Sequence, residues 1–454
     1  MFGLAVRSVR RRATAFVATF LAVFLGAVLV MAFGALADTG AATGVSDLDQ
    51  ETLTTMAVVV GGWGLLLVAF AVTSTLTLSV HQRAMEIALL KSAGATPAQL
   101  RQMILGEAGL LAVVGALVAV PFGALSGRGL LALLKRTDQV SEEVAYAFGP
   151  VALGTGLGVT ILAALGAAVV TSRRVAAMRV TAALSSAAAA EPRPKRMGKA
   201  RVIAGVVFFG ISLQLSVMAA LAGPEGFDAM QFAGSADIMF GLGLACFAPV
   251  LMRWTTTLLA GPILRFSGAS GYLAVLNLRQ RTAQLASALT PVILFVGIGV
   301  GTLWMQVIHN DTTPLSGVSA SEEAVETLNF VITGMIVLFA CIMLINTLVA
   351  ATTHRRREFG QQRLVGATHR QVLGMVAAEN LVLIVAGLGF GTIAALPTVL
   401  PMSYAKTDSW LPDPEPGLWL GTAAVAVVVT LAASLGTARR VLRTPAIETV
   451  ARAG

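Results

Sequence analysis

Charged residues are scarce in this sequence, and that scarcity excludes a water-soluble globular protein. Asp, Glu, Lys and Arg account for 12% of the 454 residues, whereas hydrophobic residues account for 56%. Cysteine is scarcer still: Cys246 and Cys341 both lie in apolar segments, which argues against a disulfide or metal framework and favours a packing role. The four histidines lack metal-ligand spacing, so no metal site is predicted at any of them: His81, His309, His354 and His369.

A phosphate-binding loop is also missing. Gly198-Lys199 is followed by Ala200 and lacks the upstream glycine of the Gly-x-x-x-x-Gly-Lys-Ser/Thr motif. The chain is therefore not predicted to be an enzyme or to hold a cofactor of its own. A net charge of +9 can indicate nucleic-acid binding, but here the arginines lie in short loops between apolar segments, so no nucleic-acid partner is predicted. The first apolar run is too long for a cleaved signal peptide.

Ten apolar segments have roughly the length of a membrane-spanning helix, which needs about 20 residues. The pattern therefore predicts an all-α integral membrane protein in the lipid bilayer. We expect the spans near 15–37, 56–80, 103–126, 150–171, 202–222, 236–260, 285–307, 328–352, 373–400 and 417–437.

The charges predict the orientation of these spans. With the amino terminus inside, 28 of the 32 Lys and Arg residues fall in inner segments, and 17 of the 23 acidic residues fall in outer loops or at their edges. Because positive charge accumulates on the cytoplasmic side, both termini are predicted to be cytoplasmic. The basic, amphipathic residues 1–14 are either an interfacial helix or a positively charged anchor.

One stretch occurs twice, at residues 83–107 (the first stretch) and 355–379 (the second stretch). A constant offset of 272 gives eight identities in 25 gapless positions, which indicates an internal duplication. The identities are Arg83, Glu86, Gly94, Ala95, Thr96, Gln99, Met103 and Glu107, with Arg355, Glu358, Gly366, Ala367, Thr368, Gln371, Met375 and Glu379 as their counterparts.

Each stretch predicts a short helix, a tight glycine turn and a capped new helix. Gly94 and Gly366 follow the short helix, where glycine tolerates the left-handed conformation past a helix end. Thr96 and Gln99 have the spacing of a capping box, with proline between them at the first helical position. The new helix then continues into a long apolar segment.

The duplicated Arg-x-x-Glu…Gly-Ala-Thr pattern between spans resembles the FtsX-like permease family of ABC transporters, the group with the MacB, LolC/LolE and BceB-type permeases. The resemblance covers about 4–184 and 276–447. It implies that the short helix after the second span is a coupling helix that docks on a cytoplasmic ATPase subunit. The implied docking residues are Arg83, Glu86, Ile87, Leu89, Leu90, Lys91, Gly94 and Thr96 in the first stretch, and Arg355, Glu358, Phe359, Arg363, Gly366 and Thr368 in the second.

The second stretch departs from the first, because Gln361-Gln362 stand where the first has Leu89-Leu90. That difference predicts a weaker apolar face and unequal docking.

We predict two parallel FtsX-like repeats of four spans each, residues 1–186 and 276–454, joined by a basic linker and two-span hairpin at 187–275. The outer loops, 38–55 and 308–327, are each about 20 residues, too short for a folded domain. MacB and BceB-type permeases carry large outer domains, and this sequence has neither.

Glu107 and Glu379 lie about 11 residues along the capped helices, which is roughly 16 Å. Acids at membrane depth are candidates for function. The alternative, which we favour, is a structural ion pair with an arginine of the same stretch, such as Arg83 or Arg355.

The resemblance implies the permease subunit of an ABC transporter in the bacterial cytoplasmic membrane. ATP and magnesium would be bound by a separate ATPase, in two copies, and the cargo would be amphiphilic or lipophilic. A non-transporting signal transmitter, of the antimicrobial-peptide resistance or cell-envelope signalling type and with a further membrane or sensor partner, is the alternative. A secondary transporter is disfavoured because charges are scarce in the middle of the spans.

Overall fold

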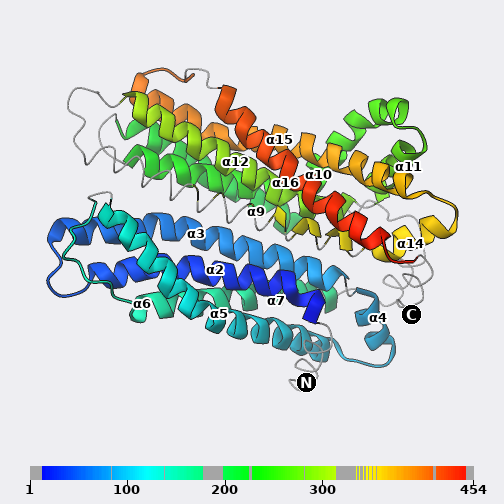
Figure 1. Cartoon of the computed structure of the whole chain (residues 1–454), viewed down its shortest axis with the longest axis horizontal. Coiled ribbons are helices and arrows are strands. Elements are labelled where there is room, and N and C mark those ends of the chain that lie inside the picture. The colour runs from blue at the N-terminus through cyan, green and yellow to red at the C-terminus, as the bar shows by residue number, and fades with distance from the viewer. Residues whose placement is uncertain are drawn as a thin grey trace. The chain divides into compact units, whose positions relative to one another are not determined.

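The computed structural model describes residues 13–82, 84–136, 139–176, 198–223, 228–280, 282–312, 355–412 and 416–445. It also describes a few isolated helical residues between 334 and 353. No strand occurs in these ranges. The helices fall into two compact units, one from α2 to α7 and one from α9 to α16 (Figure 1).

The first unit is a bundle of four long helices. Its elements are α2 (Ala13–Gly40), α3 (Asp47–Gln82), α4 (Ala84–Ser92), α5 (Pro97–Arg136), α6 (Pro150–Leu153), the π-helical η1 (Gly154–Val159) and α7 (Thr160–Ala176). The helix α2 packs along α3 and α5, and both of these pack against α7, which closes the bundle. The short α4 lies at one end of the unit and α6 at the other (Figure 1).

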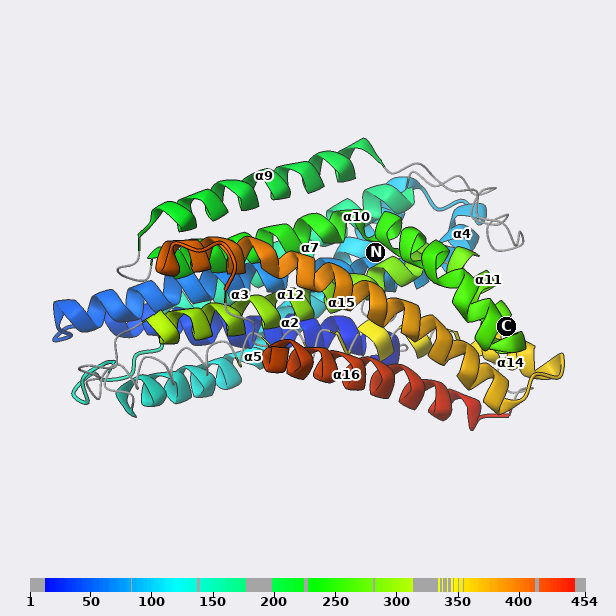
Figure 2. The same cartoon turned by 90° about the horizontal axis from the view of Figure 1, so that it is seen from above.

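The second unit has a buried central helix. Its elements are α9 (Lys199–Leu221), α10 (Asp228–Phe266), α11 (Gly268–Gln280), α12 (Thr282–Thr312), α14 (Arg356–Leu364), α15 (His369–Thr407) and α16 (Pro416–Leu442). The central helix α12 contacts α10, α15 and α16, and its side chains Leu289, Ile293 and Phe295 are fully buried. Figure 2 shows α9 along one side of this unit and α16 along the opposite side.

Eight helices of the described part are long and apolar enough to cross a membrane. In hydrocarbon a helix satisfies its own backbone hydrogen bonds, which explains why these apolar segments are helical. The prediction of an all-α membrane protein is therefore confirmed. Of the ten expected spans, 56–80 lies inside α3, and 328–352 falls mostly outside the described residues. The count of ten and the arrangement of the repeats stay predictions.

Helix boundaries recur with the same offset of 272 as the residues. The helices α5 and α15 begin at Pro97 and His369. Before them, α4 and α14 end at Ser92 and Leu364. This agreement supports the internal duplication. The helices α9 and α10, which we assigned to a separate segment, pack within the second unit against α15, and α10 also packs against α12. The division into three segments stays a prediction.

Small residues let α12 and α15 approach closely. A Cβ added to Gly387 would lie 2.2 Å from Val292 Cγ1, and one added to Gly391 would lie 2.5 Å from Val296 Cβ. Gly389 faces open space. The two glycines that lie four residues apart thus form one contact face, as is common where helices pack in lipid.

The loop expected at 38–55 is shorter in the structure than predicted. The chain between α2 and α3 is only residues 41–46, because both helices extend into the segment expected as a loop, 38–55. Asp38 caps α6, at the start of the expected span 150–171: its carboxylate accepts hydrogen bonds from the backbone N–H groups of Gly149, Val151 and Ala152 at 2.7–3.0 Å. These N–H groups have no partner within their helix, so the carboxylate stabilises that end.

Candidate functional site: the two coupling stretches

Both stretches turn through the same backbone hydrogen bonds. In the first, Ala95 N donates to Leu90 O at 2.9 Å and Gly94 N donates to Lys91 O at 3.1 Å. In the second stretch, Ala367 N donates to Gln362 O at 2.9 Å and Gly366 N donates to Arg363 O at 3.1 Å. This pair of bonds is the Schellman motif, which requires a left-handed residue, and the two glycines have φ of +94° and +106°. A Cβ at either position would meet open space, so the backbone angle alone requires glycine.

A capping box follows each turn, as the spacing predicts. Thr96 N donates to Gln99 Oε1 at 2.9 Å, and Gln99 N donates to Thr96 Oγ1 at 3.3 Å. Thr368 and Gln371 make the corresponding bonds at 2.8 and 3.2 Å. Each box satisfies two backbone groups at the start of a helix that then runs for 40 residues in α5 or 39 in α15. The short helix is thus joined to a long one through a fixed turn.

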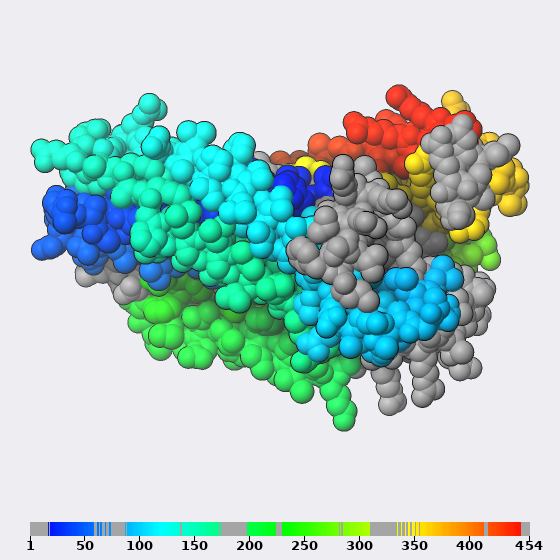
Figure 3. All heavy atoms as spheres, turned by 90° about the horizontal axis from the view of Figure 1, so that it is seen from below, coloured from blue at the N-terminus to red at the C-terminus, as the bar shows by residue number. Residues whose placement is uncertain are grey.

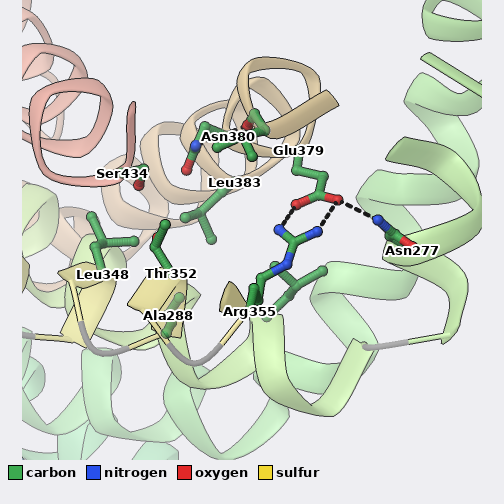
Figure 4. A pocket seen from close by; sticks show the side chains of 12 residues that line it. Asn277, Ala288, Leu348, Thr352, Arg355, Glu379, Asn380, Leu383 and Ser434 are labelled. Atoms are coloured by element: carbon green, nitrogen blue, oxygen red, sulfur yellow. Dashed lines mark hydrogen bonds and ion pairs between the residues drawn. The ribbon is translucent and has the colours of Figure 1, made fainter. Parts of the chain in front are cut away.

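Arg355 holds the second stretch to α15. Its guanidinium forms ion pairs with Glu379 and with Glu358, whose Oε2 lies 3.0 Å from Nε. Asn277 of α11 donates from Nδ2 to Glu379 Oε1 at 2.9 Å (Figure 4). Burial alone lowers the pKa of Arg355, but the two carboxylates raise it and outweigh burial, so the guanidinium stays charged. Glu379 thus forms an ion pair with Arg355, and whether this acid also has a functional role stays a prediction.

The corresponding acid of the first stretch, Glu107, is buried in α5. Its expected partner Arg83 lies outside the described residues. The role of this acid stays a prediction.

The two stretches expose apolar side chains at different positions. Leu89 and Leu90 are 56% and 41% exposed at the end of α4, and Figure 3 shows the light-blue segment that contains α4 on the molecular surface. In the second stretch, Leu364 and Val365 are 55% and 90% exposed. The expected loss of apolar surface at Gln361-Gln362 is thus offset by the next two apolar residues along the chain.

Three residues expected to dock on a partner are used inside the chain instead. Ile87 and Phe359 are buried, so they attach the short helices to the rest of their units and offer no surface for docking. Arg363 Nη1 donates to the carbonyl oxygens of Leu442 and Thr444 at 3.0 and 2.8 Å. A cation at this helix end stabilises the exposed carbonyls of α16. A role of these three residues in docking stays a prediction.

Asn277 and the contact with α16 were missed by the sequence analysis. They come from segments about 80 to 100 residues away along the chain, so no local pattern could indicate them. A cavity of about 40 Å³ lies beside Arg355 and Glu379, between Thr352 and Asn380 (Figure 4). That volume admits one or two water molecules and no larger ligand. Groups of acidic, histidine and cysteine side chains that could hold a metal do not occur in the part of the chain described here.

The fold and the paired stretches define a multi-pass, all-helical membrane protein with a duplicated short helix between long ones. The family description "FtsX-like permease C-terminal" matches residues 58–180 and 330–446, which together are more than half of the chain. The chain belongs to the FtsX-like permease family. Members of this family are membrane permease components rather than enzymes, and they generally partner with a cytoplasmic ATPase. No curated protein matches the chain.

Proposed function

We propose that this chain is the membrane subunit of an ABC transporter, in which a separate ATPase pushes on both stretches and thereby moves the long helices that follow them. The membrane is the bacterial cytoplasmic membrane, and both termini lie in the cytoplasm. This orientation is supported by the charge distribution, which leaves only four Lys and Arg residues in outer loops.

The observation that carries the proposal is the repeated turn. Both stretches have the same left-handed glycine, the same two backbone bonds and the same capping box. A helix of 40 residues is about 60 Å long, so α5 and α15 are each long enough to link a cytoplasmic stretch to the far side of the bilayer. A force on either short helix therefore has a continuous helical route across the membrane.

Two exposed apolar patches support docking of two ATPase subunits, one for each stretch. The first patch is Leu89 and Leu90, and the second is Leu364 and Val365. Covering the exposed half of one leucine stabilises a complex by about 1 kcal/mol before the cost of association. Because neither patch alone binds a partner tightly, the contact can change as the ATPase goes through its cycle.

The cargo that fits best is an amphiphilic or lipophilic compound that enters from the bilayer. The connection between α2 and α3 is only residues 41–46, so the first unit has no outer domain there to hold a soluble cargo. The cavity of about 40 Å³ is too small for such a compound, so the path must form between helices during movement.

A site-specific photocross-linker tests the docking. Placed at Leu89 or Val365 in cells that express the full chain, it should capture an ABC ATPase identified by mass spectrometry. The matched control is Leu411, equally apolar and 77% exposed but beyond the other end of α15. Capture at Leu411 with the same yield, or no ATPase at either stretch, would contradict the proposal. ATP-driven extraction of a fluorescent lipid from proteoliposomes then separates transport from signalling.

A further inference from the structure

The second unit contains a buried carboxyl group that none of the proposed steps uses. Asp237 lies on α10, and its side chain is 2% exposed. Both of its oxygens lack a hydrogen-bond partner among the described residues. It lies eight residues beyond Ala229, where the candidate span begins, which is about 12 Å along the helix. The sequence analysis did not single it out, although a lone acid in an apolar segment is itself a signal.

Two glycines of α12 leave just enough room for this carboxyl group. A Cβ added to Gly301 would lie 2.6 Å from Asp237 Oδ2, and one added to Gly297 would lie 3.3 Å from Oδ1. The carboxyl group is therefore packed directly against the α12 backbone. A metal cation, an ammonium group or a water molecule does not fit in that contact.

The groups that face Asp237 from neighbouring helices carry no charge. Ser212 of α9 donates to the carbonyl of Ala236, and Thr398 of α15 donates to the carbonyl of Ala233, one turn before Asp237. The charged and titratable side chains described on α9, α10, α11 and α15 lie at least six residues along their helices from these contacts: Lys199, Arg201, Cys246, Arg253, Arg265, Tyr272, Arg279, His369, Arg370, Glu379, Tyr404 and Lys406.

Among the residues described here, an ionised carboxylate in such a place has neither a cation nor a hydrogen-bond donor to replace the water it has lost. A buried group in that position becomes neutral instead, by taking up a proton. We propose that Asp237 is a proton-binding site, protonated while α10 and α12 are packed as they are here and ionised when the two helices separate. Movement of the second unit then releases or takes up one proton, whatever drives the movement.

Infrared spectroscopy of the full chain in lipid tests the protonation directly, because a protonated carboxylic acid has a carbonyl band that a carboxylate lacks. At neutral pH the wild type should show this band, and Asp237→Asn should lose it. Asp49→Asn is the matched control and should keep it, since Asp49 accepts hydrogen bonds from Ser141 at the outer end. A band that is absent from the wild type, or unchanged in Asp237→Asn, would overturn the proposal.

Thermal unfolding tests the link to helix packing. Asparagine is the neutral counterpart of a protonated aspartate, so Asp237→Asn should fold at least as well as the wild type. As the pH rises above the ordinary pKa of an aspartate, about 4, the wild type should lose Tm relative to this variant, because the unfolded chain releases a proton that the folded chain keeps. Parallel Tm curves, or failure of Asp237→Asn to fold, would contradict the proposal. Neither result bears on ATPase docking, which the cross-linking experiment tests separately.

Discussion

Removing the charge of Glu379 should destabilise the second unit, and the structure allows the size of the effect to be estimated. In Glu379→Gln the side chain keeps its size, and Asn277 still has an acceptor. The guanidinium of Arg355 keeps Glu358 at 3.0 Å but loses its other carboxylate. Breaking a buried ion pair costs about 3–5 kcal/mol, and the remaining carboxylate lowers that to about 2–3 kcal/mol.

A double-mutant cycle separates the pair from its surroundings. Arg355→Met leaves the Glu379 carboxylate buried without a cation, so this variant should lose about 3 kcal/mol. The double variant should lose clearly less than the sum of the two single variants, because it removes both charges of the Arg355–Glu379 pair together. The expected coupling energy is about 1.5–3 kcal/mol. The charge-removal control is Arg370→Gln, at an exposed position, which should change stability by less than about 0.5 kcal/mol.

The assay is unfolding of the detergent-purified chain, followed by intrinsic fluorescence with heat and with denaturant. Glu379→Gln should lower Tm by several degrees without changing the amount of protein inserted in the membrane. Losses that add within about 0.5 kcal/mol would refute the reasoning, because independent sites are additive to that extent. The ion pair would then contribute no more than a solvent-exposed one.

Three further predictions follow from other parts of the structure. In a Cys-free background, a cysteine at exposed Glu51 should react with a membrane-impermeant reagent from outside, whereas one at exposed Gln99 should react only after permeabilisation. Labelling of position 99 in intact cells would reverse the topology. Leu89→Gln should weaken ATPase co-purification about fivefold, and Gln361→Leu should not, because about 1 kcal/mol of apolar burial is lost only in the first. Equal effects would place the docking surface elsewhere. The hydrogen bond from Ser141 lowers the pKa of Asp49, so this carboxylate stabilises the fold above its unfolded pKa and loses that effect as the pH falls below about 4. Acid unfolding curves should show this loss in the wild type and lack it in Asp49→Asn, and identical curves would contradict the assignment.

Local patterns could be predicted from the sequence because their causes are local. The left-handed glycines at positions 94 and 366 and the Thr–Gln capping boxes depend on residues within five positions of one another. The apolar segments likewise became helices because lipid leaves the backbone no other partner. Their ends were less predictable: α15 continues to Thr407, seven residues beyond the expected span, since polar residues extend a helix beyond the hydrocarbon.

The contacts between distant segments could not be predicted in the same way. Arg363 looked available for a partner, but its carbonyl acceptors at Leu442 and Thr444 lie about 80 residues further along the chain. Ile87 and Phe359 looked like docking residues because an apolar side chain on a short helix gives no sign of which side is covered. The pairing of Arg355 with Glu379 could be predicted only because both residues are repeated in the duplication.

The central claim is that force passes from the ATPase through a rigid glycine turn, and one measurement tests it most directly. Valine at position 94 must adopt a left-handed angle at a cost of roughly 1–2 kcal/mol, and loss of the Thr96 cap costs about 1 kcal/mol. The double variant Gly94→Val with Thr96→Ala should therefore insert and bind the ATPase, since Leu89 and Leu90 are unchanged. Gly389→Ala, at a glycine that faces open space, is the control.

The quantity to measure is the ATPase rate of the reconstituted complex with and without substrate, together with substrate extraction. The account predicts normal basal hydrolysis in the double variant, loss of stimulation by substrate and loss of extraction, with the Gly389→Ala complex unaffected. Full stimulation and extraction in the double variant would show that force does not pass through this turn.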